Sequence, residues 1–333
     1  GVLTNNASVS GDNGYGIIIE GTDIVNNGTV TLNNPIPGNK SSVGLYTRGI
    51  NDITNTGDIT VGGKSVGIYG KSNINNTGNI KVGDSGTGIY SENGNVNLTA
   101  GSITVGNQQA TVLYTKGIGS IIELNGTSLD IGNGSYGIIN DGTGNTVNSR
   151  NTAQTVKNDT VYMYSKDATG NINNYTKLTS TGNVNYGLYG AGEINNYADI
   201  DFKTGYGNVG IYSSIDINTA NTSHTKAVNH NGYKIEVGDS YIDPNGHSEN
   251  NKYALGMAAG YAHSAQDKID LNSSNPAVRN RVPRETVGFA VNNGIINVNG
   301  EYSVGMYGAH AGSRVENHRT INLNKSNTIG MFL

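Results

Sequence analysis

The sequence lacks the residues on which many structural sites depend. Its 333 residues include no cysteine, which excludes disulfides and thiolate metal sites. A chain without cysteine also suits export through a narrow pore in an unfolded state, because no premature disulfide can obstruct passage. No apolar run approaches the roughly 18 residues of a membrane-spanning helix. The chain begins at Gly1 without a signal peptide and ends on a repeated phrase, so we expect a piece of a longer, exported protein.

Charged residues are also sparse. The chain has 21 Lys+Arg and 25 Asp+Glu, a formal net charge of −4. Without a basic excess, nucleic acid and anionic membrane surfaces are not expected partners. Hydrophobic residues make up 35% of the chain, below the roughly 45–50% of globular proteins. The low charge and the regular spacing of apolar residues nevertheless argue against disorder.

What the chain has in abundance is one short phrase, glycine–aliphatic–tyrosine. Its clear copies are residues 44–46, 67–69, 88–90, 187–189, 210–212 and 305–307. Looser copies are residues 16–18, 113–114, 137–139, 163–164, 256–258, 288–290 and 330–332. Self-similarity at a period of about 20 to 50 residues is typical of stacked repeat architectures. The whole chain, residues 1–333, is therefore expected to be one elongated β-helical segment.

Each repeat contains three short segments in which apolar and polar residues alternate. In one repeat they are residues 73–75, 78–82 and 87–90. Alternation with a period of two predicts strands with one buried face, while the Asn, Gly and β-branched residues disfavour helix. Three strands per turn predict an all-β fold, a right-handed, single-stranded parallel β-helix of thirteen turns. A leucine-rich repeat would need helices and a leucine consensus that are missing, and an antiparallel sandwich would not repeat one phrase so regularly.

Two further ladders accompany the repeat. One asparagine recurs at a fixed offset from the middle strand, and we expect these side chains to stack along the axis as a structural ladder. They are Asn5, Asn26, Asn55, Asn76, Asn174, Asn196, Asn292 and Asn317, with Leu98 and Leu124 near the position in the intervening turns. The repeated tyrosines should lie outside or at a corner, where ring-on-ring stacking is favoured over a stripe that binds sugars or a partner.

Function in a solenoid is expected where the repeat is interrupted, because insertions become loops on one face. Irregular loops are predicted at residues 142–160, 238–253 and 262–286, and the last two should protrude near the same end. Those two loops carry the candidate partner-binding residues, including the one basic cluster of the chain. The candidates are Asp243, His247, His263, Asp267, Arg279, Arg281 and Arg284.

The sequence does not favour catalysis. Polysaccharide lyases and hydrolases with this fold need clustered carboxylates, but Asp199 and Asp201 have no evident acidic partner in neighbouring turns. No nucleophile elbow is present, the histidines lack metal-ligand spacing, and no phosphate loop can be singled out among the many glycines. No enzymatic activity, cofactor or metal is therefore expected.

The unit at residues 73–82, followed by 86–90, resembles the passenger repeats of type V autotransporters. It is most similar to the large fusobacterial outer-membrane autotransporter adhesins. The resemblance covers essentially the whole chain and implies a β-helical passenger held at, or secreted from, the outer membrane of a Gram-negative bacterium. It also implies coaggregation with other bacteria and binding to host cells, a role in virulence. No binding residues are carried over from the group.

These observations lead to three hypotheses. The first is a cell-surface adhesin passenger, a stalk or adhesive segment whose loops bind a protein or glycan receptor on a bacterial or host cell, with no membrane insertion of this segment. The second is a carbohydrate-active β-helix, a lyase or hydrolase. The third is a pure scaffold with recognition elsewhere in the parent protein.

Overall fold

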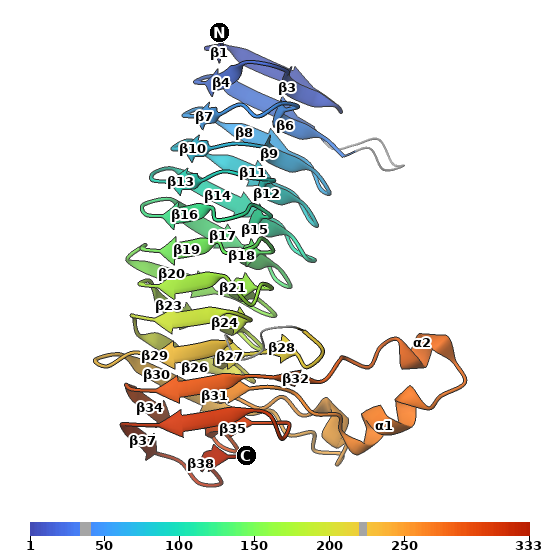
Figure 1. Cartoon of the computed structure of the whole chain (residues 1–333), viewed down its shortest axis with the longest axis vertical. Helices are drawn as coiled ribbons and strands as arrows, with labels where there is room; N and C mark the ends of the chain where they lie inside the picture. Colours follow the sequence, from blue (N-terminus) through green and yellow to red (C-terminus); the bar gives the residue numbers. More distant parts are fainter. Residues whose placement is uncertain (34–40, 220–224) are drawn as a thin grey trace.

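The computed structural model describes residues 1–33, 41–219 and 225–333, and these form a parallel β-solenoid with three strands per turn. Figure 1 shows the turns stacked along the long axis, with the N-terminus at one end and the C-terminus near the other. The predicted fold class is therefore confirmed. Strands of successive turns pair in parallel and in register, so equivalent residues form columns about 4.8 Å apart.

The first face is one sheet of twelve strands. These are β1 (Val2–Asn5), β4 (Asp23–Asn26), β7 (Ile53–Asn55), β10 (Ile74–Asn76), β13 (Val96–Leu98), β16 (Ile121–Leu124), β19 (Thr146–Ser149), β22 (Asn171–Asn174), β25 (Glu193–Asn196), β29 (Lys226–Asn229), β33 (Phe289–Asn292) and β36 (Arg314–Asn317).

The second face is split into two six-stranded sheets. The first contains β2 (Ser8–Gly11), β5 (Thr29–Leu32), β8 (Ile59–Val61), β11 (Ile80–Val82), β14 (Ser102–Val105) and β17 (Ser128–Ile131). The second contains β20 (Ala153–Val156), β23 (Lys177–Ser180), β26 (Ile200–Tyr206), β30 (Lys234–Asp239), β34 (Ile295–Val298) and β37 (Thr320–Leu323).

The third face, again of twelve strands, carries the glycine–aliphatic–tyrosine phrase. Its strands are β3 (Tyr15–Ile19), β6 (Val43–Thr47), β9 (Val66–Gly70), β12 (Thr87–Ser91), β15 (Thr111–Thr115), β18 (Tyr136–Asn140), β21 (Val161–Ser165), β24 (Tyr186–Gly190), β27 (Val209–Ser213), β31 (Leu255–Ala259), β35 (Val304–Gly308) and β38 (Ile329–Phe332). Twelve of the thirteen copies of the phrase lie here. The copy at residues 288–290 is an exception, because Phe289 and Ala290 belong to β33 on the first face.

The core is a continuous column of aliphatic side chains, since alternate residues of every strand point inward. In one turn Ile53, Ile59 and Ile68 come from the three faces and are at most 1% exposed. Each stacks on its equivalent in the next turn, as Ile53 does on Ile74. Few apolar residues per turn therefore suffice for a dry interior, which explains the low hydrophobic content of the chain.

The glycine of the repeated phrase is required by close packing between turns. A Cβ on Gly67 would lie 2.5 Å from the carbonyl oxygen of Gly88 and 2.6 Å from Cγ2 of Ile80, both in the next turn. An added Cβ would lie similarly close to a carbonyl oxygen and an isoleucine Cγ2 at five other copies: Gly44, Gly88, Gly210, Gly256 and Gly305. Two turns carry a larger residue in place of this glycine, Val112 and Tyr162. In each case the next turn has a leucine instead of an isoleucine on the second face, Leu129 after Val112 and Leu178 after Tyr162. Leucine lacks the β-branch that isoleucine places against the glycine.

The predicted asparagine ladder is present, and the structure places it inside the solenoid at the end of the first-face strands. Asn55 donates through Nδ2 to Oδ1 of Asn76 at 2.7 Å and to the Gly57 carbonyl at 3.0 Å, and it accepts from Nδ2 of Asn26 at 2.7 Å. Leu98 and Leu124 continue the register, as expected. The ladder also includes Ser149 and Asn229, which the sequence pattern did not reveal.

The segment at residues 142–160 was predicted to be an irregular loop, and that prediction is wrong. It contains β19 and β20, both paired in register with the following turn. The interior of this turn is filled in an unusual way, because Tyr162 replaces the glycine and is fully buried. Its hydroxyl lies 2.7 Å from the Ser149 hydroxyl, which occupies the asparagine position. Polar and aromatic side chains thus replace the residues of the repeat pattern in this turn, and the prediction from that pattern failed here.

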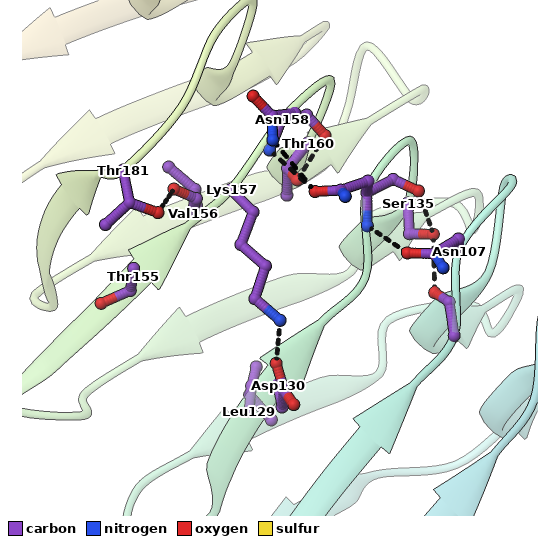
Figure 2. A network of polar contacts seen from close by, with 12 residues as sticks. Asn107, Leu129, Asp130, Ser135, Thr155, Val156, Lys157, Asn158, Thr160 and Thr181 are labelled. Carbon is purple, nitrogen blue, oxygen red and sulfur yellow. Dashed lines mark hydrogen bonds and ion pairs between the residues drawn. The ribbon is translucent and has the colours of Figure 1, made fainter. Parts of the chain in front are cut away.

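The same turn marks the break in the second face between β17 and β20. Gln154 replaces the aliphatic residue of β20 and donates its side-chain amide to the Leu129 carbonyl at 3.1 Å. Figure 2 shows how the corner remains connected, with Nζ of Lys157 2.6 Å from a carboxylate oxygen of Asp130 in the preceding turn. The Asn158 backbone amide also donates to Oδ1 of Asn133 at 3.3 Å. Side chains therefore join the two halves where the backbone ladder is interrupted.

Candidate functional site

The largest departure from the solenoid is a segment of residues 260–287, here called the lateral excursion. It leaves the third face after β31 and returns to the first face at β33, and it carries α1 (Ala265–Leu271) and α2 (Pro276–Arg279). Figure 1 shows the two helices far to the side of the stacked turns, near the C-terminal end. The predicted interval 262–286 therefore contains two short helices, which the sequence analysis did not anticipate.

A short antiparallel strand pair anchors the lateral excursion to the solenoid. β28 (Ile215–Asp216), from the connection after β27, pairs with β32 (Thr286–Val287). The side chains of Ile215 and Val287 pack with Ala168 and Ala191 of earlier turns in a small apolar cluster outside the main core. Connections from two neighbouring turns thus brace one another at the base of the helices.

Charged groups reinforce this base. Nη1 of Arg284 lies 2.9 Å from a carboxylate oxygen of Asp216, and this hydrogen bond holds the pKa of Asp216 below its ordinary value. Oε1 of Glu285 accepts from the His263 backbone amide at 2.9 Å and lies 3.5 Å from Nδ1 of the same histidine. Nε2 of His310, from the next turn, lies 4.0 Å from Oε2. The backbone hydrogen bond from His263 is the main cause of the lowered pKa of Glu285.

The first helix begins with a capping box. The Ser264 hydroxyl accepts from the Asp267 backbone amide, and the Asp267 carboxylate accepts from the Ser264 backbone amide in return. The Tyr261 hydroxyl also donates to this carboxylate, at 2.5 Å. Hydrogen bonds from Ser264 and then Tyr261 lower the pKa of Asp267. Asp267 thus fixes where α1 starts relative to the base of the excursion.

The helices themselves bury nothing. Neither α1 nor α2 has a buried residue, and Ile269 and Leu271 are 64% and 39% exposed. Arg279 donates to the Ser273 carbonyl at 2.7 Å, while Arg281 is exposed beside it. The tip therefore carries exposed apolar side chains and exposed guanidinium groups, and arginine is enriched in protein-binding surfaces.

The second candidate loop was predicted at residues 238–253 and spans residues 240–254, because Gly238 and Asp239 belong to β30. It lies at the opposite end of β31 from the lateral excursion and contains one 3-10 turn, η2 (Ser248–Asn250). Asp243 is 7% exposed and accepts from the Asn245 backbone amide at 2.8 Å and from the Asn250 side chain at 2.7 Å. The hydrogen bond from Asn250 is the main cause of its lowered pKa. His247 is exposed, with Nδ1 3.2 Å from a Glu249 carboxylate oxygen. Asp243 therefore shapes this loop, whereas His247 faces solvent.

The structure divides the predicted residues into separate groups. His263, Asp267 and Arg284 meet at the base of the excursion, and Arg279 and Arg281 lie further out near α2. Asp243 and His247 lie in the other loop. The sequence analysis missed Tyr261, Asp216, Glu285 and His310 at the base. Asp216 and His310 contact residues 68 and 25 positions away, and the six-residue spacing of Tyr261 and Asp267 matches no local motif.

The tyrosine column consists mainly of rings stacked on one another, as predicted. Tyr69 and Tyr90 have ring centroids 4.9 Å apart at 12°, and Tyr90 and Tyr114 are 5.3 Å apart at 5°. A second row at the first corner stacks Tyr175, Tyr197 and His230 beneath the guanidinium of Arg150. Most ring faces are therefore covered by other rings and are closed to a stacking ligand.

One carboxylate pair was not anticipated from the sequence. Asp201 lies directly opposite Glu236 in the next turn on the second face. Both are engaged, since Oδ2 of Asp201 lies 3.4 Å from Nζ of Lys203, and Glu236 accepts from Asn297 at 3.0 Å and Asn299 at 2.6 Å. These contacts are those of a surface network between strands.

Comparisons with protein-family models, with curated proteins and with solved structures give no match. Within residues 1–33, 41–219 and 225–333, no helix has the length and apolar character needed to cross a bilayer. The same residues contain no cluster of three or more His, Cys, Asp or Glu able to hold a metal ion.

Acid is expected to loosen the base of the lateral excursion. The folded-state pKa values of Asp216, Asp267 and Glu285 are lowered, so their contribution is complete above the ordinary carboxyl range and is lost as pH falls through the lowered values. Because those ordinary values are 3.8 and 4.5, we expect loosening below about pH 4. The absence of native cysteine allows one fluorophore at Arg281→Cys, whose anisotropy should fall in this range. The same label at Lys81→Cys, on the solenoid, should be unaffected. A fall centred near pH 6 would contradict the assignment to these carboxylates.

Proposed function

We propose that the chain is a display segment of a bacterial cell-surface adhesin, an autotransporter passenger whose lateral excursion contacts the partner. The observation that supports this most is the braced excursion with an unburied tip. The solenoid supplies a stiff support, and β28, β32 and the ion pairs fix the angle at which the helices project. Multivalent display on a cell surface would compensate for a weak single contact.

The tip has features expected of a protein contact. Ile269 and Leu271 of α1 supply exposed apolar area, and Arg279 and Arg281 in and after α2 supply exposed cationic groups. Arginine is among the residues enriched at interface hot spots. The complementary surface would be a protein receptor with an apolar groove rimmed by carboxylates, on another bacterium or a host cell.

Beads coated with the protein should bind such cells, and the double variant Ile269→Ser/Arg281→Ser should bind at least about tenfold more weakly. Neither residue is buried, so the fold should be unchanged. A matched control is Ile118→Ser/Lys81→Ser, because Ile118 is 79% exposed on the solenoid and Lys81 is exposed on β11. Counting bound beads per cell over a concentration series gives the comparison.

Two outcomes would favour the competing hypotheses. Equal binding by the double variant and the control would place recognition elsewhere and leave this segment a scaffold. Product release from a polysaccharide panel that disappears in Asp201→Asn and Glu236→Gln would indicate a carbohydrate-active enzyme. We do not expect the second outcome, because both carboxylates are engaged by neighbouring side chains.

A further inference from the structure

A cavity interrupts the closed tyrosine surface of the third face. It has a volume of about 340 Å³ and is lined by Tyr136, Val161, Tyr164, Tyr186 and Tyr189. Ligand pockets start at roughly 300 Å³, so this one suits a single small group. It lies in β18, β21 and β24, two to four turns before β31, and it shares no residue with the proposed adhesive tip.

The cavity exists because one ring is missing from a column. Tyr136, Val161 and Tyr186 occupy the same register position in three successive turns. Tyr136 and Tyr186 are therefore two turns, or about 9.6 Å, apart along the axis, with the small Val161 between them. The neighbouring column supplies Tyr164 and Tyr189 as the side of the cavity, with ring centroids 4.9 Å apart at 42°. Rings also contact one another across the two columns, since Tyr136 stacks on Tyr164 at 6.4 Å and Tyr186 meets Tyr189 edge-on at 5.6 Å. The result is a cage of four tyrosines around a valine.

The chain itself shows what fills such a gap elsewhere. In the neighbouring column Ile139 interrupts the rings between Tyr114 and Tyr164. The ammonium of Lys166 lies over this gap, 5.5 Å from the Tyr114 centroid and 5.9 Å from the Tyr164 centroid. Asp141 lies 3.5 Å from the same ammonium. A cation held by ring faces and a nearby carboxylate thus occupies the equivalent space one column away.

The surroundings of the cavity are also suited to a cation. None of the five lining residues is cationic, and the Lys166 ammonium, 5.9 Å from the Tyr164 centroid, is paired with Asp141. The exposed carboxylate of Asp159 lies two residues before Val161, and it contributes, after burial and Tyr189, to the raised pKa of Tyr186. Burial raises the pKa of Tyr164 to about 12, so its hydroxyl is neutral at physiological pH. The walls therefore offer neutral aromatic faces under a negative local potential.

We propose that this tyrosine cage binds a quaternary ammonium group, such as that of choline. A quaternary ammonium cannot donate hydrogen bonds and needs aromatic faces and a diffuse negative potential, which the cage supplies. A primary ammonium such as that of lysine is strongly hydrated and would need acceptors that the walls do not provide beyond the tyrosine hydroxyls. A phosphate or carboxylate would lie near the exposed carboxylate of Asp159, with no cation among the lining residues.

The test is titration calorimetry with choline and with its uncharged isostere 3,3-dimethylbutanol, which has the same shape. Choline should bind at least about fivefold more tightly than the isostere, since the cation–ring attraction is absent from the latter. Val161→Tyr should abolish choline binding, because the new ring completes the column between Tyr136 and Tyr186. Val66→Tyr, in the same column but between Val43 and Thr87, is the matched control and should leave binding unchanged.

Tyr186→Leu should weaken choline binding, whereas Tyr186→Phe should retain it because the ring face is preserved. Equal affinity for choline and its isostere, or binding of neutral monosaccharides without choline, would overturn the proposal. So would the absence of choline binding by the unaltered chain. If choline binds, flotation with phosphatidylcholine vesicles distinguishes a lipid headgroup from a soluble or polymer-linked source.

Discussion

Gly67→Ala is expected to lower the stability of the solenoid by about 3 kcal/mol, although it adds a single methyl group. That methyl would lie 2.5 Å from the Gly88 carbonyl oxygen and 2.6 Å from Cγ2 of Ile80. The first contact is with backbone and the second with a fully packed side chain, so neither can yield without separating two turns. The damage should therefore appear first in the turns that contain β9 and β12.

The matched control is Gly330→Ala in the last copy of the phrase. No heavy atom lies within 4 Å of the Cβ that this substitution adds, and we expect a change within about 0.5 kcal/mol. Denaturant unfolding would give the overall effect, and hydrogen exchange would locate it, because stability in a solenoid is a sum over neighbouring turns. Equal effects at the two positions would show that the glycine is not required by packing between turns.

Asn55→Ala should also destabilise strongly, by about 3 kcal/mol, because it breaks a buried ladder in the middle. Asn55 is fully buried and makes three amide hydrogen bonds, to Asn26, Asn76 and the Gly57 carbonyl. Removing its side chain leaves those buried groups without this partner, so the cost includes their desolvation.

Asn75→Ala provides the comparison, since Asn75 lies one residue from the ladder and faces outward. Its Oδ1 accepts from Asn97 at 2.8 Å in a partly buried position, where water can replace the bond, so we expect about 1 kcal/mol or less. Thermal unfolding of the two variants beside the unaltered chain would measure both. A smaller effect for Asn55→Ala than for Asn75→Ala would contradict a structural role for the ladder.

The repeated part of the structure was predictable because each turn sees nearly the same environment. Alternation in residues 78–82 gave a strand, and stacking of one turn on the next placed equivalent residues in columns. The asparagine ladder followed from a constant offset. The constant offset did not identify Asn229, because its turn has two extra residues before Ile235. It also did not identify Ser149, because serine replaces asparagine at that position.

The candidate site was predictable as an interval but not as a set of contacts. Residues 262–286 stood out because the phrase was delayed. The roles of Asp267 and Arg284 depend on Tyr261 and Asp216, and the latter comes from another insertion 68 residues earlier. The tyrosine cage was missed for a related reason. In the sequence Tyr136 and Tyr186 look like ordinary members of the repeat. The missing ring at Val161 becomes apparent only when the three turns are stacked.

The sequence by itself determined the class of the fold, the number of strands per turn and the main columns of the core. A period of two within strands and of about 20 to 25 between turns leaves few other ways to bury one apolar face. Tertiary structure alone decided where the second face breaks, how the lateral excursion is braced and where the aromatic surface opens. These features depend on contacts between turns, such as Lys157 with Asp130, β28 with β32 and Tyr136 with Tyr186 across Val161. Nothing local in the chain encodes such contacts, because each requires residues that are far apart in sequence to stack along the axis.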